Sequence, residues 1–172
     1  MLYEIVQIIY ANDRLFLLWF DDENTGVLTL QQHLVFSRSI APLIYFSDNN
    51  DILLNRDSIS HFAYVDFSEL LSWLDNPTPD INCAYFVDSW NMLSDILESC
   101  ATSGVFCSQS RNEDSRGLYN KLFWGANLPG YTPSGKINIP DWHFEDLCLL
   151  QSLLRAACHE LAEVIRQGQE QY

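Results

Sequence analysis

The hydrophobic pattern of the chain changes its period near residue 66. Before this point, apolar residues are largely β-branched or aromatic and occur in short runs bounded by polar turns, a pattern that indicates strands. Beyond it, apolar residues recur every three or four positions, which is typical of amphipathic helices. Strands followed by helices predict an α+β fold, in which an antiparallel sheet from the N-terminal half is packed by helices mainly from the C-terminal half.

Four segments of the N-terminal half are predicted to be strands. The first two are separated by the polar residues 11–14 and are expected to form a hairpin. Residues 27–39 fit either a short helix or a strand, and Pro42 is expected to interrupt the chain before the next strand. The predicted strands cover residues 3–10, 15–20, 43–46 and 61–67.

Three helices are predicted in the C-terminal half. The first is capped by Asp66 or Ser68, and the second is capped by Asp88 and stopped by Gly104. Residues 108–138 are rich in Ser, Asn, Gly and Pro, and we expect mostly loop there, with a helical turn near 118–124. The last helix is the clearest element and starts at Pro140. Its apolar stripe consists of Leu147, Leu150, Leu154, Ala157, Leu161 and Ile165.

The length of 172 residues fits a single domain over residues 1–172. No long polar linker divides the chain, and no internal repeat is visible. No apolar run approaches the ~20 residues that span a bilayer, and the first residues lack the basic region of a secretory signal. A soluble, cytoplasmic protein is therefore expected.

The sequence contains no recognisable catalytic or metal-binding motif. The five cysteines lack the paired spacing of zinc sites, and two of them, Cys148 and Cys158, are expected near one buried helix face. Gly130–Ile137 resembles a phosphate-binding loop but has Ile137 where that loop needs a hydroxyl. We therefore expect no catalytic residue, no metal and no cofactor. The alternative is a small enzyme whose Cys/His centre is assembled from distant segments, with Cys107 or His143 beside a carboxylate.

The charge balance is strongly acidic, with 23 Asp and Glu against 9 Lys and Arg and a net charge of −14. A field of this sign repels nucleic acids and anionic membranes, and it attracts basic proteins. Neither nucleic acid nor membrane is therefore expected as a partner, although acidic proteins also use such charge for solubility alone.

The negative charge is concentrated between Arg56 and Arg111, where the sequence has no Lys or Arg. This base-free interval contains eight acidic residues interleaved with aromatic ones. Solvated helix faces and helix caps account for part of this pattern, but such faces normally mix both signs. We interpret the interval as a surface for a basic protein, with Trp73 as an aromatic anchor. The expected binding carboxylates are those of Asp75, Asp80, Asp88, Asp95 and Glu98.

In these features the chain resembles the bacterial immunity proteins of polymorphic-toxin systems, including those of contact-dependent growth inhibition. The resemblance is one of type: a small acidic α+β chain without catalytic signature and with an aromatic-rich acidic segment, Asp57 to Glu98. It implies a non-enzymatic protein that binds and neutralises a basic cognate toxin, often a nuclease, in the cytoplasm. The remaining alternative is an acidic adaptor or scaffold subunit.

Overall fold

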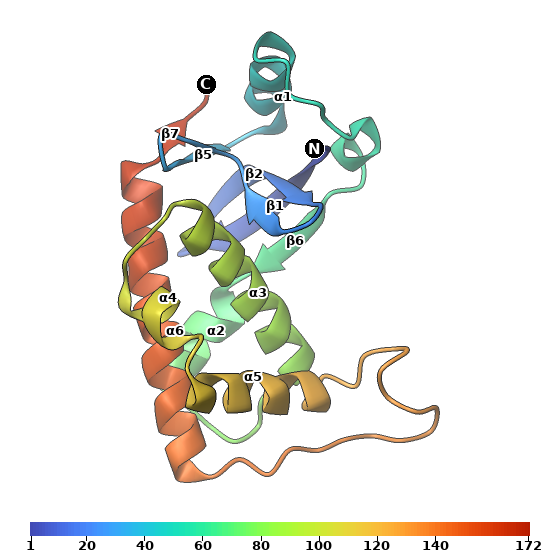
Figure 1. Cartoon of the computed structure of the whole chain (residues 1–172), viewed down its shortest axis with the longest axis vertical. Helices are drawn as coiled ribbons and strands as arrows, with labels where there is room; N and C mark the ends of the chain where they lie inside the picture. Colours follow the sequence, from blue (N-terminus) through green and yellow to red (C-terminus); the bar gives the residue numbers. More distant parts are fainter.

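A computed structural model describes residues 1–172 and confirms the α+β class, with a mostly antiparallel, mostly N-terminal sheet and six α-helices (Figure 1). The sheet has seven strands: five follow the order β4-β5-β2-β1-β6, while β3 pairs with β2 and β7 pairs with β5. The strands are β1 (Tyr3–Tyr10), β2 (Asp13–Asp21), β3 (Thr25–Val27), β4 (Thr29–Leu30), β5 (His33–Ser37), β6 (Ala63–Asp66) and β7 (Gln169–Glu170).

The predicted hairpin is present as β1 and β2, which pair in register from Tyr3 opposite Phe20 to Tyr10 opposite Asp13. The turn between them is the two residues Ala11 and Asn12, both with positive φ. Such a two-residue turn matches the right-handed twist of the flanking strands. The hairpin therefore forms the centre of the sheet.

Two of the strand pairs are parallel. β6 lies along β1 at one edge of the sheet, and the C-terminal β7 lies along β5. A parallel neighbour requires a crossover connection, which for β6 is made by residues 38–62. Because β6 is the last strand of the sheet order, no further strand covers its outer edge.

The helices lie on both faces of the sheet, and most of them on one face (Figure 1). A short 3-10 helix, η1 (Arg56–Ile59), precedes β6. The α-helices are α1 (Ile40–Asn49), α2 (Ser68–Asp75), α3 (Cys83–Ser99), α4 (Val105–Gln109), α5 (Glu113–Gly125) and α6 (Phe144–Gln167).

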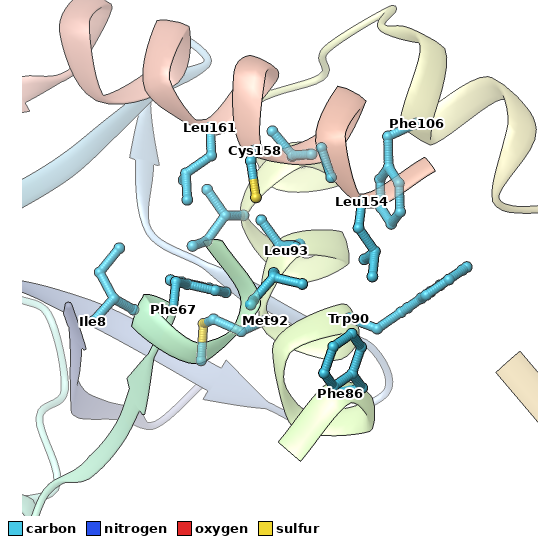
Figure 2. Close-up of a cluster of buried hydrophobic side chains, with 14 of the residues drawn as sticks. Ile8, Phe67, Phe86, Trp90, Met92, Leu93, Phe106, Leu154, Cys158 and Leu161 are labelled. Atoms are coloured by element: carbon cyan, nitrogen blue, oxygen red, sulfur yellow. The ribbon is translucent and has the colours of Figure 1, made fainter. Parts of the chain in front are cut away.

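The main hydrophobic core contains 30 buried residues between one sheet face and the helices of the C-terminal half. Figure 2 shows Ile8 of β1 and Phe67 beside Leu93 of α3, with Cys158 and Leu161 of α6 above them. A smaller cluster of six buried residues, including Leu43 of α1, covers the opposite face. Each fully buried Leu or Phe contributes about 1.5–3 kcal/mol, so these clusters hold the helices against the sheet.

The prediction of a strand at residues 43–46 was wrong, because this segment belongs to α1. Pro42 lies in the first turn of that helix, where its missing N–H removes no intrahelical hydrogen bond. Leu43 and Ser47, one turn apart, are both buried. For residues 27–39, which fit either a helix or a strand by sequence, the strand alternative is correct, because β4 and β5 form a hairpin there.

The predicted helix boundaries also need correction. α3 starts at Cys83 with Asn82 as its cap, so Asp88 lies inside the helix. Gly104 precedes α4 and does not stop α3. Residues 113–125 form α5, where mostly loop was expected.

The last helix starts at Phe144, later than expected, and His143 precedes it. The backbone N–H of His143 donates to the Asp146 carboxylate over 3.2 Å, which closes the first turn. Cys158 is buried as expected, whereas Cys148 is exposed. No helix is both long and apolar enough to span a membrane.

Candidate functional site

Two adjoining hollows lie between the outer edge of β6 and α3. They share Tyr64, Val65 and Asp88, and together we call them the β6–α3 groove. The first has a volume of about 540 Å³ and the second about 300 Å³. The polar residues of the first hollow include Asp66, Ser68, Glu69, Asn82, Tyr85 and Asp88. The second adds Trp19 of β2 and Asn91, Met92 and Asp95 of α3.

The first hollow is built around the junction at which β6 ends and α2 begins. The Asp66 carboxylate accepts a 2.9 Å hydrogen bond from the backbone N–H of Ser68, which helps to start α2. The Tyr85 hydroxyl donates to the Asp66 carbonyl over 2.6 Å and accepts from the Leu70 N–H over 2.9 Å. Burial raises the pKa of Tyr85, so its hydroxyl stays a donor and ties α3 to this junction.

Three carboxylates line the first hollow, those of Asp66, Glu69 and Asp88. None of them takes part in an ion pair, and no Lys or Arg lines either hollow. Burial raises the pKa of Asp88, which is the direction expected when a carboxylate loses water without gaining a cationic partner. The groove therefore has unneutralised negative charge.

The structure brings together only two of the five carboxylates expected to bind a partner. Asp88 and Asp95 lie on one side of α3 and line the groove. Asp75 and Asp80 are exposed at and beyond the end of α2, outside both hollows. Glu98 pairs with Arg111 over 2.9 Å, so the base at the end of the interval neutralises it.

Asp95 has a structural role in addition to its place in the groove. Its Oδ2 accepts a 2.9 Å hydrogen bond from the indole N–H of Trp19, and its Oδ1 accepts a 2.6 Å bond from the Thr25 hydroxyl. These bonds connect β2 and β3 to α3. Asp95 thus has fewer free acceptor positions for a partner than Asp88 has.

Trp73 does not occupy the position of an exposed anchor. Its side chain belongs to the main core and is 7% exposed. The indole N–H donates to the Thr78 carbonyl over 2.9 Å, and the ring packs edge-on against Phe86 at 5.2 Å between centroids. Trp73 therefore stabilises the contact between α2 and α3.

Sequence reasoning missed the aromatic residue of the groove, Tyr64, whose side chain is 68% exposed. It also interpreted Asp66 as a helix-capping residue; Phe67 is the N-cap of α2, while the Asp66 carboxylate accepts from the Ser68 N–H and lines the groove. The strand pattern of residues 61–67 could have indicated an exposed Tyr64. Val65 packs on the core, and because successive side chains of a strand alternate between its faces, Tyr64 must point away from that core.

The two residues considered for an enzymatic centre lie far from an activated geometry. The Cys107 sulfur is 3.3 Å from the Thr102 hydroxyl, and burial, with a smaller effect from nearby Glu160 and Glu98, raises the pKa of its thiol. A neutral thiol is a weak nucleophile. The exposed His143 ring is 3.8 Å from the exposed Asp141 carboxylate at the start of α6. No group of three or more His, Cys, Asp or Glu residues is arranged to hold a metal ion.

Comparisons with known proteins support the architecture alone. No family model and no curated protein matches the chain. Among solved structures, the crystal structure of the SatS C-terminal domain in complex with bromine is similar, with a TM-score of 0.57. The two share 14% sequence identity over 98% of this chain and 94% of that chain. The chain thus shares its overall fold with the SatS C-terminal domain.

Proposed function

We propose that this protein is a non-enzymatic immunity protein that binds and neutralises a basic toxin through the β6–α3 groove. The observation that carries the proposal is the set of carboxylates of Asp66, Glu69 and Asp88, which lie without cationic neighbours beside the exposed Tyr64. The proposal moves the binding surface away from Asp75, Asp80, Glu98 and Trp73, and retains Asp88 and Asp95.

The chemistry of the groove matches an Arg- or Lys-rich protein surface. Guanidinium groups form charge-assisted hydrogen bonds with carboxylates, and the exposed ring of Tyr64 offers an apolar contact at the edge of the groove. Uncompensated charge also accelerates encounter with a partner of opposite sign. An approaching cation would stabilise the ionised form of Asp88 and offset the effect of its burial.

A toxin that cleaves nucleic acid supplies the required partner. Such an enzyme holds phosphates in a basic cleft, so carboxylates presented in place of phosphates block it. Neutralisation of this kind takes place in the cytoplasm of the producing cell and needs no cofactor. An acidic adaptor subunit would bind a basic protein equally well but would protect no cell, which separates the two functions experimentally.

The test is growth rescue. Each gene that neighbours the coding gene is expressed alone in a heterologous bacterium, and any product that arrests growth is co-expressed with this chain. We expect the wild-type chain to restore growth and to bind the toxic product in a purified mixture. If it rescues growth from none of the toxic neighbours, the immunity function is refuted.

Charge-reversed variants locate the surface. The Glu69→Lys/Asp88→Lys pair should slow association with the toxin by about tenfold or more and abolish rescue, because it converts attraction to repulsion. The control pair Asp22→Lys/Glu23→Lys changes the charge equally at exposed positions in the turn between β2 and β3, outside the groove. Equal effects of the two pairs would show that only net charge matters and would reject the groove as the site.

A further inference from the structure

The outer edge of β6 carries backbone groups that no other strand covers. β6 is the last strand of the sheet order and pairs only with β1. Phe67 N–H donates to the Ile9 carbonyl over 2.9 Å, so the N–H groups of Ala63 and Val65 also point toward β1. By alternation, the N–H groups of Tyr64 and Asp66 point away from the sheet.

One of the outward groups is already satisfied, because the Asp66 carbonyl accepts from the Tyr85 hydroxyl. The N–H and C=O of Tyr64 and the N–H of Asp66 remain on the outer edge. β6 contains no Lys, Pro or bulge, which are three of the features that prevent an edge strand from pairing; it is short, with four residues, so an added strand would pair over a short stretch. The edge also forms one wall of the β6–α3 groove.

We propose that the partner binds by adding an extended basic segment to the outer edge of β6. This inference rests on the proposed function and specifies how the same surface is used. The backbone of the segment would pair with Tyr64 and Asp66, which extends the sheet by one strand over the groove. Backbone pairing supplies affinity, and the side chains of the groove supply the preference for charge.

The pleat of the added strand determines which of its residues are basic. The residue opposite Tyr64 places its side chain beside the Tyr64 ring and is expected to be apolar. Its two neighbours point to the face of Val65, where Asp88 and Asp95 of α3 line the groove, and are expected to be Arg or Lys. The recognised pattern is therefore basic–apolar–basic.

Charge complementarity favours a basic segment of another protein over a second copy of this chain at the edge of β6. Edge-to-edge pairing of two β6 strands would bring two sets of Asp66, Glu69 and Asp88 together with no Lys or Arg between them. Like charges in such proximity oppose association. A basic segment instead neutralises the groove, which favours a different protein as the partner.

A peptide of eight alternating Arg and Val residues is the probe, and its binding to the full chain is measured by fluorescence anisotropy. Two further peptides carry backbone N-methyl groups on all Val residues or on all Arg residues. In an added strand only one of these sets of N–H groups faces β6, so only one peptide should lose affinity, by about tenfold or more. The sensitive set also reports whether the added strand is parallel or antiparallel.

Equal binding by all three peptides, equal loss in both methylated peptides, or no binding of the unmethylated peptide would overturn strand addition. The variant Tyr64→Pro removes one outward N–H and no bond to β1, so it should weaken binding of the unmethylated peptide about tenfold. If Tyr64→Pro does not fold, the comparison of the methylated peptides still decides the question.

The variant Asp88→Asn separates this inference from the proposed function. If it weakens all three peptides while methylation has no effect, the acidic groove is retained and strand addition is refuted. If methylation discriminates but no toxic neighbour is neutralised, the edge is a binding site and the immunity function is refuted.

Discussion

The indole Nε1–H of Trp19 donates a 2.9 Å hydrogen bond to Oδ2 of Asp95, and this bond joins the centre of the sheet to α3. Both side chains are partly buried where they meet, at the wall of the β6–α3 groove. The bond holds α3 and its neighbouring carboxylate Asp88 at a defined position beside β6.

Replacing Asp95 with Ala should lower the free energy of unfolding by about 1–3 kcal/mol, because the Trp19 indole and the Thr25 hydroxyl lose their acceptor. Asp88, on the same side of α3 and without an ion-pair partner, is the matched control, and Asp88→Ala should change stability by less than about 0.5 kcal/mol. Urea unfolding followed by tryptophan fluorescence measures both. Equal stability of the two variants would show that the Trp19–Asp95 bond contributes nothing.

Gly104 lies against the carboxylate of Glu160, which accepts a 2.9 Å hydrogen bond from the Phe106 N–H at the start of α4. A Cβ at Gly104 would overlap that carboxylate, so Gly104→Ala should displace it and cost about 1–2 kcal/mol. Gly117, inside α5, has no neighbouring atom within 4 Å of an added Cβ, and Gly117→Ala should stabilise by about 0.5–1 kcal/mol. Thermal unfolding of both variants tests these opposite signs.

Ala11 adopts a φ of 49° in the β1–β2 turn, in the left-handed region that is unfavourable for most side chains. Asn tolerates this region better, so Ala11→Asn should raise the free energy of unfolding by about 0.5 kcal/mol. The same change at exposed Ala162 in α6 should lower it by about 0.5 kcal/mol, because Asn is a poor helix former. Stabilisation at both positions, or at neither, would contradict this account of the turn.

Alkaline pH should destabilise the protein through Cys158, whose pKa burial raises from 9.0 to about 12. Below pH 9 the thiol is protonated in both states, and its contribution is fully present. Between pH 9 and 12 the unfolded chain loses the proton while the native state keeps it, so stability falls by up to about 1.4 kcal/mol per pH unit.

The measurement is urea unfolding at several pH values above 8. In Cys158→Ala the decline should be shallower than in wild type, whereas Cys148→Ala should keep the wild-type slope because Cys148 is exposed. Parallel declines in wild type and Cys158→Ala would show that the buried thiol does not titrate on unfolding.

The α+β class and the central hairpin followed from local patterns. β1 and β2 are runs of mostly β-branched, aromatic and other apolar residues joined by a short polar turn, and α6 shows a long apolar stripe. These signals are local because the hairpin buries both of its faces, which gives continuous apolar runs, whereas α6 buries one face, which its sequence period records. The prediction of a strand at residues 43–46 was wrong because a short apolar run fits a strand or one turn of a helix equally well.

The candidate site could be predicted only in part. The absence of bases between Arg56 and Arg111 indicated a negative region, and two of the acidic residues of this interval, Asp88 and Asp95, line the groove. Sequence alone did not separate them from Glu98, because Arg111 follows α4 and reaches Glu98 only through the fold of the chain between α3 and α5. It also placed Trp73 at the surface, although that indole is enclosed by the core.

By itself, the sequence determined the class of fold, the acidic character and the stretch of chain that carries the uncompensated charge. The tertiary structure alone decided that Asp66 and Asp88 share one hollow, that Tyr64 lies beside them and that β6 ends the sheet. The physical reason is that charge and periodicity are properties of neighbouring residues. A surface, in contrast, is made by strand order and helix packing between residues distant along the chain.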